Sequence, residues 1–262
     1  MARDPYPSDL TDNEWEKIEP LLPGPMQTGR PRTNDYREVW NALFYIARTG
    51  CQWRYLPHDF LPYSSVYRHF REWRDDGTFE SINDFLRKEV RVESGKKQEP
   101  TAAILDSRSV KTTEVGGEHG YDAGKKVNGR KQHILVDTLG MILAMEVQPA
   151  DVQDRDGAKS VLLRAKRKCP NIQLVWADSG YRGILVYWVS VVCAWTLSIV
   201  TRPNEIKGFI IQKWRWIVER TFAWLQRSRR LSKDYEIFPK SNEAWCYVVM
   251  TRIMVRRLAV SG

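Results

Sequence analysis

The stretch VWADSGYRG, residues 175–183, places one carboxylate, Asp178, directly after an apolar run and before a Ser-Gly turn. The stretch AILDSRSVKT, residues 103–112, repeats this pattern with Asp106. Short apolar runs of this kind are typical of buried strands, and the small residues after each acid leave it uncovered. If the two strands lie parallel and adjacent, both acids stand at the same edge of one sheet, where open α/β sheets place their active sites.

The overall composition indicates a basic, globular chain. It has 262 residues, which is enough for one large domain or two smaller ones. The 41 Lys and Arg residues exceed the 32 Asp and Glu residues, which gives a net charge of +9 and a pI near 9.4. Such an excess favours an anionic partner, and nucleic acid is the commonest one. The alternative is a solvated basic surface without a partner.

Other features exclude several classes of protein. The four cysteines contain no CxxC pair, and zinc-ligand spacing is absent from the sequence. The segment MARDPYPSDL lacks the apolar core of a signal peptide, so we expect a cytoplasmic protein. The uncharged stretch 184–200 has 17 residues, whereas a membrane span needs about 20. We predict a buried helix there, followed by a strand near WTLSIV, and no membrane association.

Residues 1–95 carry the patterns of a helical domain. The stretch LTDNEWEKIEPLL, residues 10–22, begins with a capping box, in which Thr11 and Glu14 each satisfy a backbone N–H group. Further helices are predicted at about residues 35–49, 64–77 and 79–91. The polar stretch 91–102 is typical of a linker.

The third of these helices combines one apolar side with several basic positions. Its apolar side is predicted to consist of Val66, Phe70 and Trp73. Its other sides carry polar residues that include Arg68, His69, Arg71 and Arg74. A short helix, a turn and a basic helix form the layout of a helix-turn-helix, whose second helix enters the major groove. We therefore interpret the three arginines as DNA contacts, and the alternative is an ordinary surface helix.

Residues 96–262 are typical of an α/β domain. Strands are predicted within residues 102–110, 131–140 and 141–150, and the last two are joined as a hairpin at DTLGM. A helix over residues 156–169 and a strand within residues 172–180 follow. Three strands, a helix and a returning strand predict a mixed sheet with flanking helices.

The clearest helical pattern covers residues 211–231, and it supplies a third acid. Glu219 falls on the polar side of this helix, opposite the apolar stripe, together with Arg215. An exposed Glu219–Arg215 pair is the simpler interpretation of these two residues. However, three carboxylates on two strands and a helix suit Mg²⁺, which prefers oxygen ligands. Two such ions about 4 Å apart can activate an attacking oxygen and stabilise a leaving oxygen in phosphoryl displacement.

In this order along the chain, the motifs resemble those of the DDE transposases of bacterial insertion sequences, in the insertion-sequence-four/five group. The resemblance covers nearly the whole chain. LTDNEWEKIEPLLP, GRPR, RTGCQWRYLP and VYRHFREW are similar to the family's amino-terminal and helical DNA-binding segments. Its catalytic blocks are similar to ILDSRSVKT, GYDAGKKVNGRKQHILVDTLG, ADVQDRDGA, WADSGYRG and WIVERTFAWLQRSRRLSKDYE.

This resemblance implies a ribonuclease-H-like catalytic domain after a helical domain that ends near residue 95. It implies a catalytic, metal-binding triad at Asp106, Asp178 and Glu219, with Mg²⁺ as the cofactor and Mn²⁺ as a substitute. The implied reaction is cleavage of double-stranded DNA at terminal inverted repeats, then transfer of the 3′-hydroxyl ends into target DNA by cut-and-paste. The resemblance also implies a homodimer on paired ends and a location at the bacterial nucleoid.

The family's signature around the last acid is Tyr-x2-Arg-x3-Glu-x6-Lys. Arg215 and Glu219 match it, whereas Gln212 and Gln226 stand at the Tyr and Lys positions. A glutamine cannot supply the charge of Lys, so DNA contact near Gln226 is either weaker or taken over by Arg227 or Arg229. The remaining DNA contacts are expected from basic residues near the acids: Lys125, Lys126, Arg130, Lys131, Arg182 and Arg215.

Two alternatives stay open. A catalytically weakened or inactive relative would keep its DNA-binding helices, and alanine at Asp178 would then change nothing. A metal nuclease of the same fold would cut branched DNA without joining it. DNA binding by any of these proteins would weaken steeply with salt, because phosphate contacts release counterions.

Overall fold

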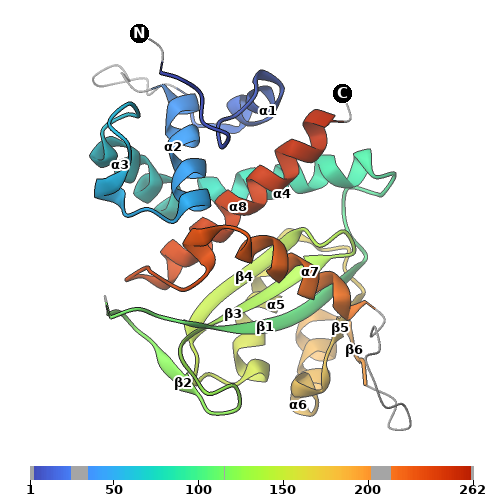
Figure 1. Cartoon of the computed structure of the whole chain (residues 1–262). Helices are drawn as coiled ribbons and strands as arrows, with labels where there is room; N and C mark the ends of the chain where they lie inside the picture. Colours follow the sequence, from blue (N-terminus) through green and yellow to red (C-terminus); the bar gives the residue numbers. More distant parts are fainter. Residues whose placement is uncertain (1–2, 25–34, 115, 202–213, 261–262) are drawn as a thin grey trace.

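The computed structural model describes residues 3–24, 35–114, 116–201 and 214–260 (Figure 1). A helical amino-terminal region precedes a six-stranded mixed sheet, and helices cover both faces of that sheet. The last helix, α8 (Pro239–Val260), returns to the amino-terminal helices and packs against α4 (Thr78–Glu93) (Figure 1). The two ends of the described chain therefore lie in the same part of the molecule.

The helices of the amino-terminal region follow the predicted pattern closely. They are α1 (Asp12–Ile18), α2 (Tyr36–Thr49), α3 (Tyr63–Asp75) and α4, with 3-10 turns at Glu19–Leu21 and Trp53–Tyr55. The capping box of α1 is confirmed, since the side chains of Thr11 and Glu14 accept each other's backbone N–H groups. The apolar side of α3 is confirmed as well. His69 was placed wrongly on its polar sides, because the ring is buried and stacks on Trp73.

The sheet is mixed, with parallel and antiparallel strands, as predicted. Its strands are β1 (Ala102–Lys111), β2 (Gly120–Asp122), β3 (Val127–Asp137), β4 (Ile142–Pro149), β5 (Leu174–Ala177) and β6 (Thr196–Ile199). Strand β3 pairs antiparallel with β1, β2 and β4, whereas β5 lies parallel to both β1 and β6. The five longer strands therefore run β4-β3-β1-β5-β6 across the sheet, and the β3–β4 hairpin is confirmed.

Alternation along β1 assigns its residues to two different hydrophobic cores. Ala103 and Leu105 face the core beneath α5 (Asp154–Lys168), whereas Ile104 faces the core beneath α7 (Arg215–Gln226) and α8. Asp106 has the same parity as Ile104 and therefore points to the α7 face. Ser107 points to the α5 face instead.

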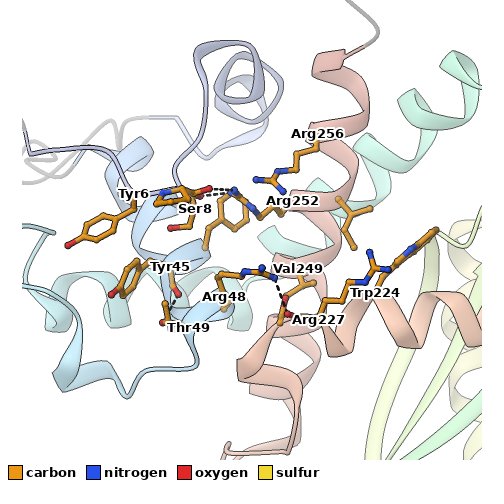
Figure 2. Close-up of a pocket in the computed structure, with 15 residues that line it drawn as sticks. Tyr6, Ser8, Tyr45, Arg48, Thr49, Trp224, Arg227, Val249, Arg252 and Arg256 are labelled. Carbon is orange, nitrogen blue, oxygen red and sulfur yellow. Dashed lines mark hydrogen bonds between the residues drawn. The ribbon is translucent and has the colours of Figure 1, made fainter.

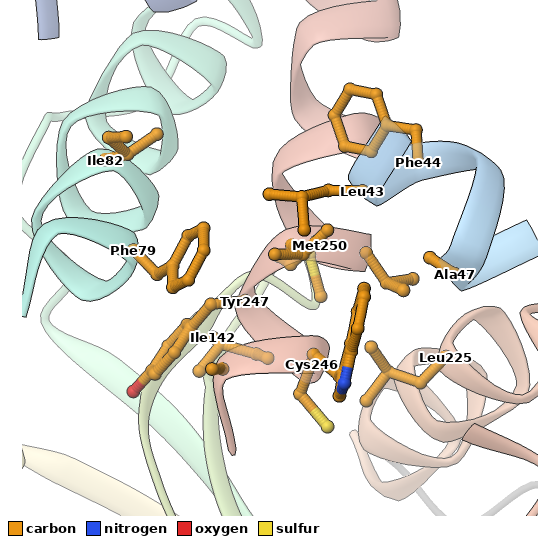
Figure 3. Packing of buried hydrophobic residues seen from close by; sticks show 14 of the residues in the cluster. Leu43, Phe44, Ala47, Phe79, Ile82, Ile142, Leu225, Cys246, Tyr247 and Met250 are labelled. Atoms are coloured by element: carbon orange, nitrogen blue, oxygen red, sulfur yellow. The ribbon is translucent and has the colours of Figure 1, made fainter. Parts of the chain in front are cut away.

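Helix α8 joins the amino-terminal helices to the sheet through one hydrophobic core (Figure 3). Its buried Tyr247 and Met250 lie among residues of α2 and α4, while Ile142 approaches from the sheet (Figure 3). The sequence pattern did not single out this helix, because it is buried on most sides and has no polar stripe. The domain boundary near residue 95 stays a prediction, because this one core contains residues from before and after that position.

The stretch 184–200 forms a helix and a strand, as predicted. Helix α6 (Ile184–Trp188) continues as one π-helical turn over Val189–Cys193, and β6 follows. The helix is buried on one side only, because Ile184 and Tyr187 are exposed on its other side. Among the described residues, none of the helices combines the length and apolarity needed to cross a membrane.

Candidate active site

The register of the sheet places Asp106 and Asp178 side by side. Ile104 on β1 pairs with Trp176 on the parallel strand β5, and each acid stands two residues further along its chain. Both side chains therefore point to the α7 face of the sheet. Asp178 follows the end of β5, as predicted, whereas Asp106 lies in the middle of β1 because that strand continues to Lys111.

Helix α7 brings the third acid to the same face. Its apolar stripe of Ile217, Val218, Thr221, Phe222 and Leu225 is buried. Glu219 lies on the polar side of the helix, as predicted, and is exposed. The predicted start of this helix at residue 211 falls outside the described residues, and the described helix begins at Arg215. Trp214, directly before it, has a φ of 75° and stacks on Trp176 at 4.8 Å between ring centroids.

One guanidinium nitrogen connects the three acids. Arg215 Nη2 lies 3.7 Å from Asp106 Oδ2, 3.6 Å from Asp178 Oδ2 and 3.6 Å from Glu219 Oε1. These distances allow electrostatic attraction but exceed the length of a hydrogen bond. The structure thus brings together the three acids from β1, the end of β5 and α7, with a cation between them.

Local hydrogen bonds orient the two aspartates. Asp106 Oδ1 accepts a hydrogen bond from the Ser107 N–H at 2.7 Å, and Asp178 Oδ1 accepts one from the Gly180 N–H at 2.8 Å. The pKa of Asp106 is raised to about 6, mainly because the carboxyl group is buried, and the charge of Asp178 acts in the same direction. The Ser107 N–H and Arg215 act in the opposite direction. The ionised form of Asp106 is therefore costly unless a cation stands nearby.

The donor set suits a hard divalent cation, since all three side chains offer carboxylate oxygens. The three carboxylates also lie near one another. Because like charges repel, this arrangement is favourable only when positive charge lies between them. Within the described ranges, no three Asp, Glu, His or Cys side chains stand close enough to hold a metal ion as they are. Here the three carboxylates are spaced around a guanidinium instead.

A polar network on the other face of the sheet supports β1 next to Asp106. Ser107 Oγ donates to Asp154 Oδ1 at 2.7 Å, and Lys131 Nζ lies 3.1 Å from the same carboxylate oxygen. Asp154 therefore does more than begin α5, which is the simpler role that its sequence position suggests. Its partners come from β1 and β3, so the sequence offered no local signal for this network.

Six of the residues predicted to contact DNA are exposed: Arg68, Arg71, Lys125, Lys126, Arg182 and Arg227. Arg68 and Arg71 lie on α3, Lys125 and Lys126 lie in the turn between β2 and β3, and Arg182 follows Asp178 by four residues. Arg215 is largely occupied by the three acids. Gln212 lies outside the described residues, and Gln226 is exposed at the end of α7.

Three other predicted contacts are held inside the protein. Arg130 is fully buried and pairs with Asp234 at 2.9 Å. Lys131 is also buried, between Asp154 and the carbonyl oxygen of Val152. Arg74 donates two hydrogen bonds to Asp75 and retains 11 % of its side-chain exposure. We assign structural roles to these three cations, because their charges are already engaged.

Comparison with known proteins gives partial matches to several relatives. The chain is 35 % identical over 85 residues to protein y4sN of Sinorhizobium fredii, covering 32 % of this chain and 67 % of that protein. It is 29 % identical over 126 residues to "Putative transposase for insertion sequence element IS402" of Burkholderia cepacia, covering 41 % of this chain and 54 % of the relative.

Among solved structures, one similar chain is in the Mos1 transposase paired-end complex with left transposon end. The alignment covers 92 % of this chain and 82 % of that chain at 11 % sequence identity. Its TM-score of 0.28 is too low to support an argument about fold or function.

Two family profiles match consecutive parts of the chain. Residues 10–83 match the family described as "Putative transposase of IS4/5 family". Residues 97–254 match the family described as "Transposase DDE domain", and this match alone covers more than half of the chain and all three acids. The chain therefore belongs to the DDE transposases, a family of enzymes that cleave and transfer DNA.

Proposed function

We propose that this transposase cuts DNA at the terminal inverted repeats of its own insertion sequence and joins the freed 3′-hydroxyl ends to target DNA by cut-and-paste. The convergence of Asp106, Asp178 and Glu219 on one guanidinium nitrogen is the observation that carries the proposal. Carboxylates from three separate elements gather at this place in spite of their like charges, which is typical of a site built for cations.

In this proposal, Asp106, Asp178 and Glu219 hold Mg²⁺, and Mn²⁺ can replace it. When bound, two such ions supply activation of the attacking oxygen and stabilisation of the leaving oxygen in an in-line displacement. The protein contributes the alignment of the site. The backbone N–H groups of Ser107 and Gly180 donate hydrogen bonds that fix the two aspartates. Glu219 is held by α7, whose opposite side is firmly packed.

Arg215 has a second role in the proposed site. Its guanidinium balances the three carboxylates in the structure described here. With metal ions present, the three acids have other cations to pair with, and Arg215 can contact a DNA phosphate as well. A guanidinium matches the geometry of phosphate oxygens, so this residue would orient the DNA next to the acids.

The exposed cations would hold the remaining DNA. Arg68 and Arg71 on α3 are proposed to contact the inverted repeat, while Lys125, Lys126, Arg182 and Arg227 contact phosphates nearer to the acids. A homodimer on paired ends and a cytoplasmic location at the nucleoid belong to the same proposal.

A transposition assay in vitro tests this function. The donor is a plasmid that carries the DNA flanking the gene, with Mg²⁺ present, and wild type is compared with Asp178→Asn. This substitution keeps the shape of the side chain and removes its charge, so joined product should fall by more than about 100-fold, as when one stabilising group is lost from an active site. Glu89→Gln, on the exposed side of α4, is the matched control and should retain activity.

The alternatives predict different results in this assay. Salt-sensitive binding to the flanking DNA without product from the wild type would indicate a catalytically inactive relative. Cut DNA without joined product would indicate a nuclease. Equal activity of wild type and Asp178→Asn would contradict the role proposed for the three acids.

A further inference from the structure

A cleft that is separate from the three acids lies between the amino-terminal region and the last two long helices. It has a volume of about 660 Å³ and is bordered by residues 6–8 and by parts of α2, α7 and α8. Figure 2 shows its side chains approaching one another from these separate elements. The volume is within the range of sites that take a small ligand or part of a larger one.

Four arginines line this space, which we call the arginine cleft. They are Arg48 from α2, Arg227 at the end of α7, and Arg252 and Arg256 from α8 (Figure 2). Neither Asp nor Glu is present among the described residues of the lining. Arg48 Nη1 donates to the carbonyl oxygen of Arg227 at 3.2 Å, so these two residues lie side by side. The cleft therefore concentrates positive charge.

Arg252 is a partly buried cation, and Arg256 is a second cation close to it. Burial, and next the charge of Arg256, lower the pKa of the Arg252 guanidinium to about 10. The side chain stays in place because it donates to the carbonyl oxygens of Pro7 and Ser8 and lies 4.9 Å from the centre of the Phe44 ring. Glu14, outside the lining, contacts Arg256 at 3.6 Å. An anion in the cleft would relieve the remaining repulsion.

Helix α7 connects the arginine cleft to the three acids. Glu219 and Arg227 are eight residues apart, which corresponds to roughly 12 Å along a helix. Between them, the guanidinium carbon of Arg220 lies 4.6 Å from the ring centres of both Trp216 and Trp224. Alternating cations and aromatic rings are typical of surfaces on which nucleic acid strands lie.

We propose that the arginine cleft binds the phosphodiester backbone of the same DNA whose reacting end lies at the three acids. The distance along α7 places this contact roughly three to four base pairs from the cut, at about 3.4 Å per base pair. The inference rests on the proposed function, because that function places a DNA end at Glu219. It adds a contact made jointly by the amino-terminal region and α8, away from the basic side of α3.

Binding of a DNA duplex tests the cleft without requiring catalysis. The probe carries the DNA that flanks the gene, and binding is measured at several salt concentrations with EDTA present. Each phosphate contact contributes about 0.9 to the slope of log K against log salt. The double variant Arg48→Gln/Arg256→Gln, at two exposed residues of the lining, should therefore reduce the slope by about 2. Arg167→Gln, an exposed change on α5 beyond the opposite face of the sheet, should leave it unchanged.

A second probe locates the contact on the DNA. Neutral methylphosphonates three to four base pairs from the cut should weaken binding to wild type, and they should have little further effect on the double variant. An unchanged salt slope in the double variant would overturn the inference. So would an equal methylphosphonate effect in both proteins, which would mean that residues outside the cleft contact those phosphates.

The two proposals can fail independently. If wild type joins DNA but the double variant keeps the wild-type salt slope, only the cleft inference is overturned. If wild type neither cuts nor joins DNA but the slope falls by about 2 in the double variant, the cleft binds DNA and the proposed function fails.

Discussion

Replacing Arg130 by methionine is expected to destabilise the protein without removing a DNA contact. Arg130 has no exposed surface, and its Nη1 lies 2.9 Å from Asp234 Oδ2. Its guanidinium also donates to the carbonyl oxygens of Glu118, Glu236 and Ile237. One side chain thus ties β3 to the segment that leads into α8.

The size of the expected loss of stability follows from the buried groups that methionine leaves without a partner. Asp234 would remain a buried carboxylate without its cation, and removing one partner of a buried ion pair costs about 3–5 kcal/mol. In a chain of this size, each kcal/mol lost from the free energy of unfolding lowers the melting temperature by roughly 2–4 °C. The Arg130→Met variant should therefore melt about 10 °C below wild type. Removing both charges in Arg130→Met/Asp234→Leu should recover part of this loss.

Circular dichroism melting and DNA binding distinguish the two possible roles of Arg130. Arg167→Met, an exposed change, is the control for loss of one positive charge. A melting temperature within about 2 °C of wild type, together with a salt slope lowered by about 1, would refute the reasoning. That result would mean that Arg130 leaves its buried pair to contact DNA.

Three further predictions concern packing, thiols and metal. Gly157→Ala should lower the free energy of unfolding, measured in urea, by a net value of about 1–2 kcal/mol. The new Cβ would stand 2.3 Å from Nε2 of the buried His133. This clash outweighs the gain of about 1 kcal/mol in helix propensity. Ala at Gly24, which meets nothing within 4 Å, is its control, and equal stability of the two variants would contradict the packing argument. Iodoacetamide should label Cys51 before Cys246, because burial raises the pKa of the Cys246 thiol to about 12. Peptide mass spectrometry that finds the reverse order of labelling would refute this. EDTA should stop strand transfer and Mn²⁺ should restore it, whereas joined product in EDTA would exclude a metal requirement.

The positions of the two aspartates could be predicted because they depend on local patterns and one topological assumption. Each apolar run marks a strand, and parallel pairing of the runs is enough to align Asp106 with Asp178. The helical wheel of α7 predicted the polar side for Glu219, whereas its place in the triad was implied by the family resemblance. Strand β2 was missed because three residues carry too little alternation. Asp106 was expected at the edge of the sheet because the apolar run of β1 stops before it, although the strand continues to Lys111.

The roles of the basic residues could not be predicted in the same way. Arg130 and Lys126 look alike in the sequence, since both are cations near the first acid. They differ because Asp234, 104 residues further along the chain, neutralises Arg130, whereas Lys126 lies in an exposed turn. Which cations are free for DNA is decided by long-range partners, and the arginine cleft escaped prediction for the same reason.

The packing of α8 has a consequence for biosynthesis. This helix is the last described element to leave the ribosome, yet it packs against α1, α2 and α4. During translation the amino-terminal helices therefore emerge well before the partner that covers their apolar sides. The nascent chain must keep these surfaces from aggregating, and the amino-terminal region becomes complete only after α8 has been synthesised.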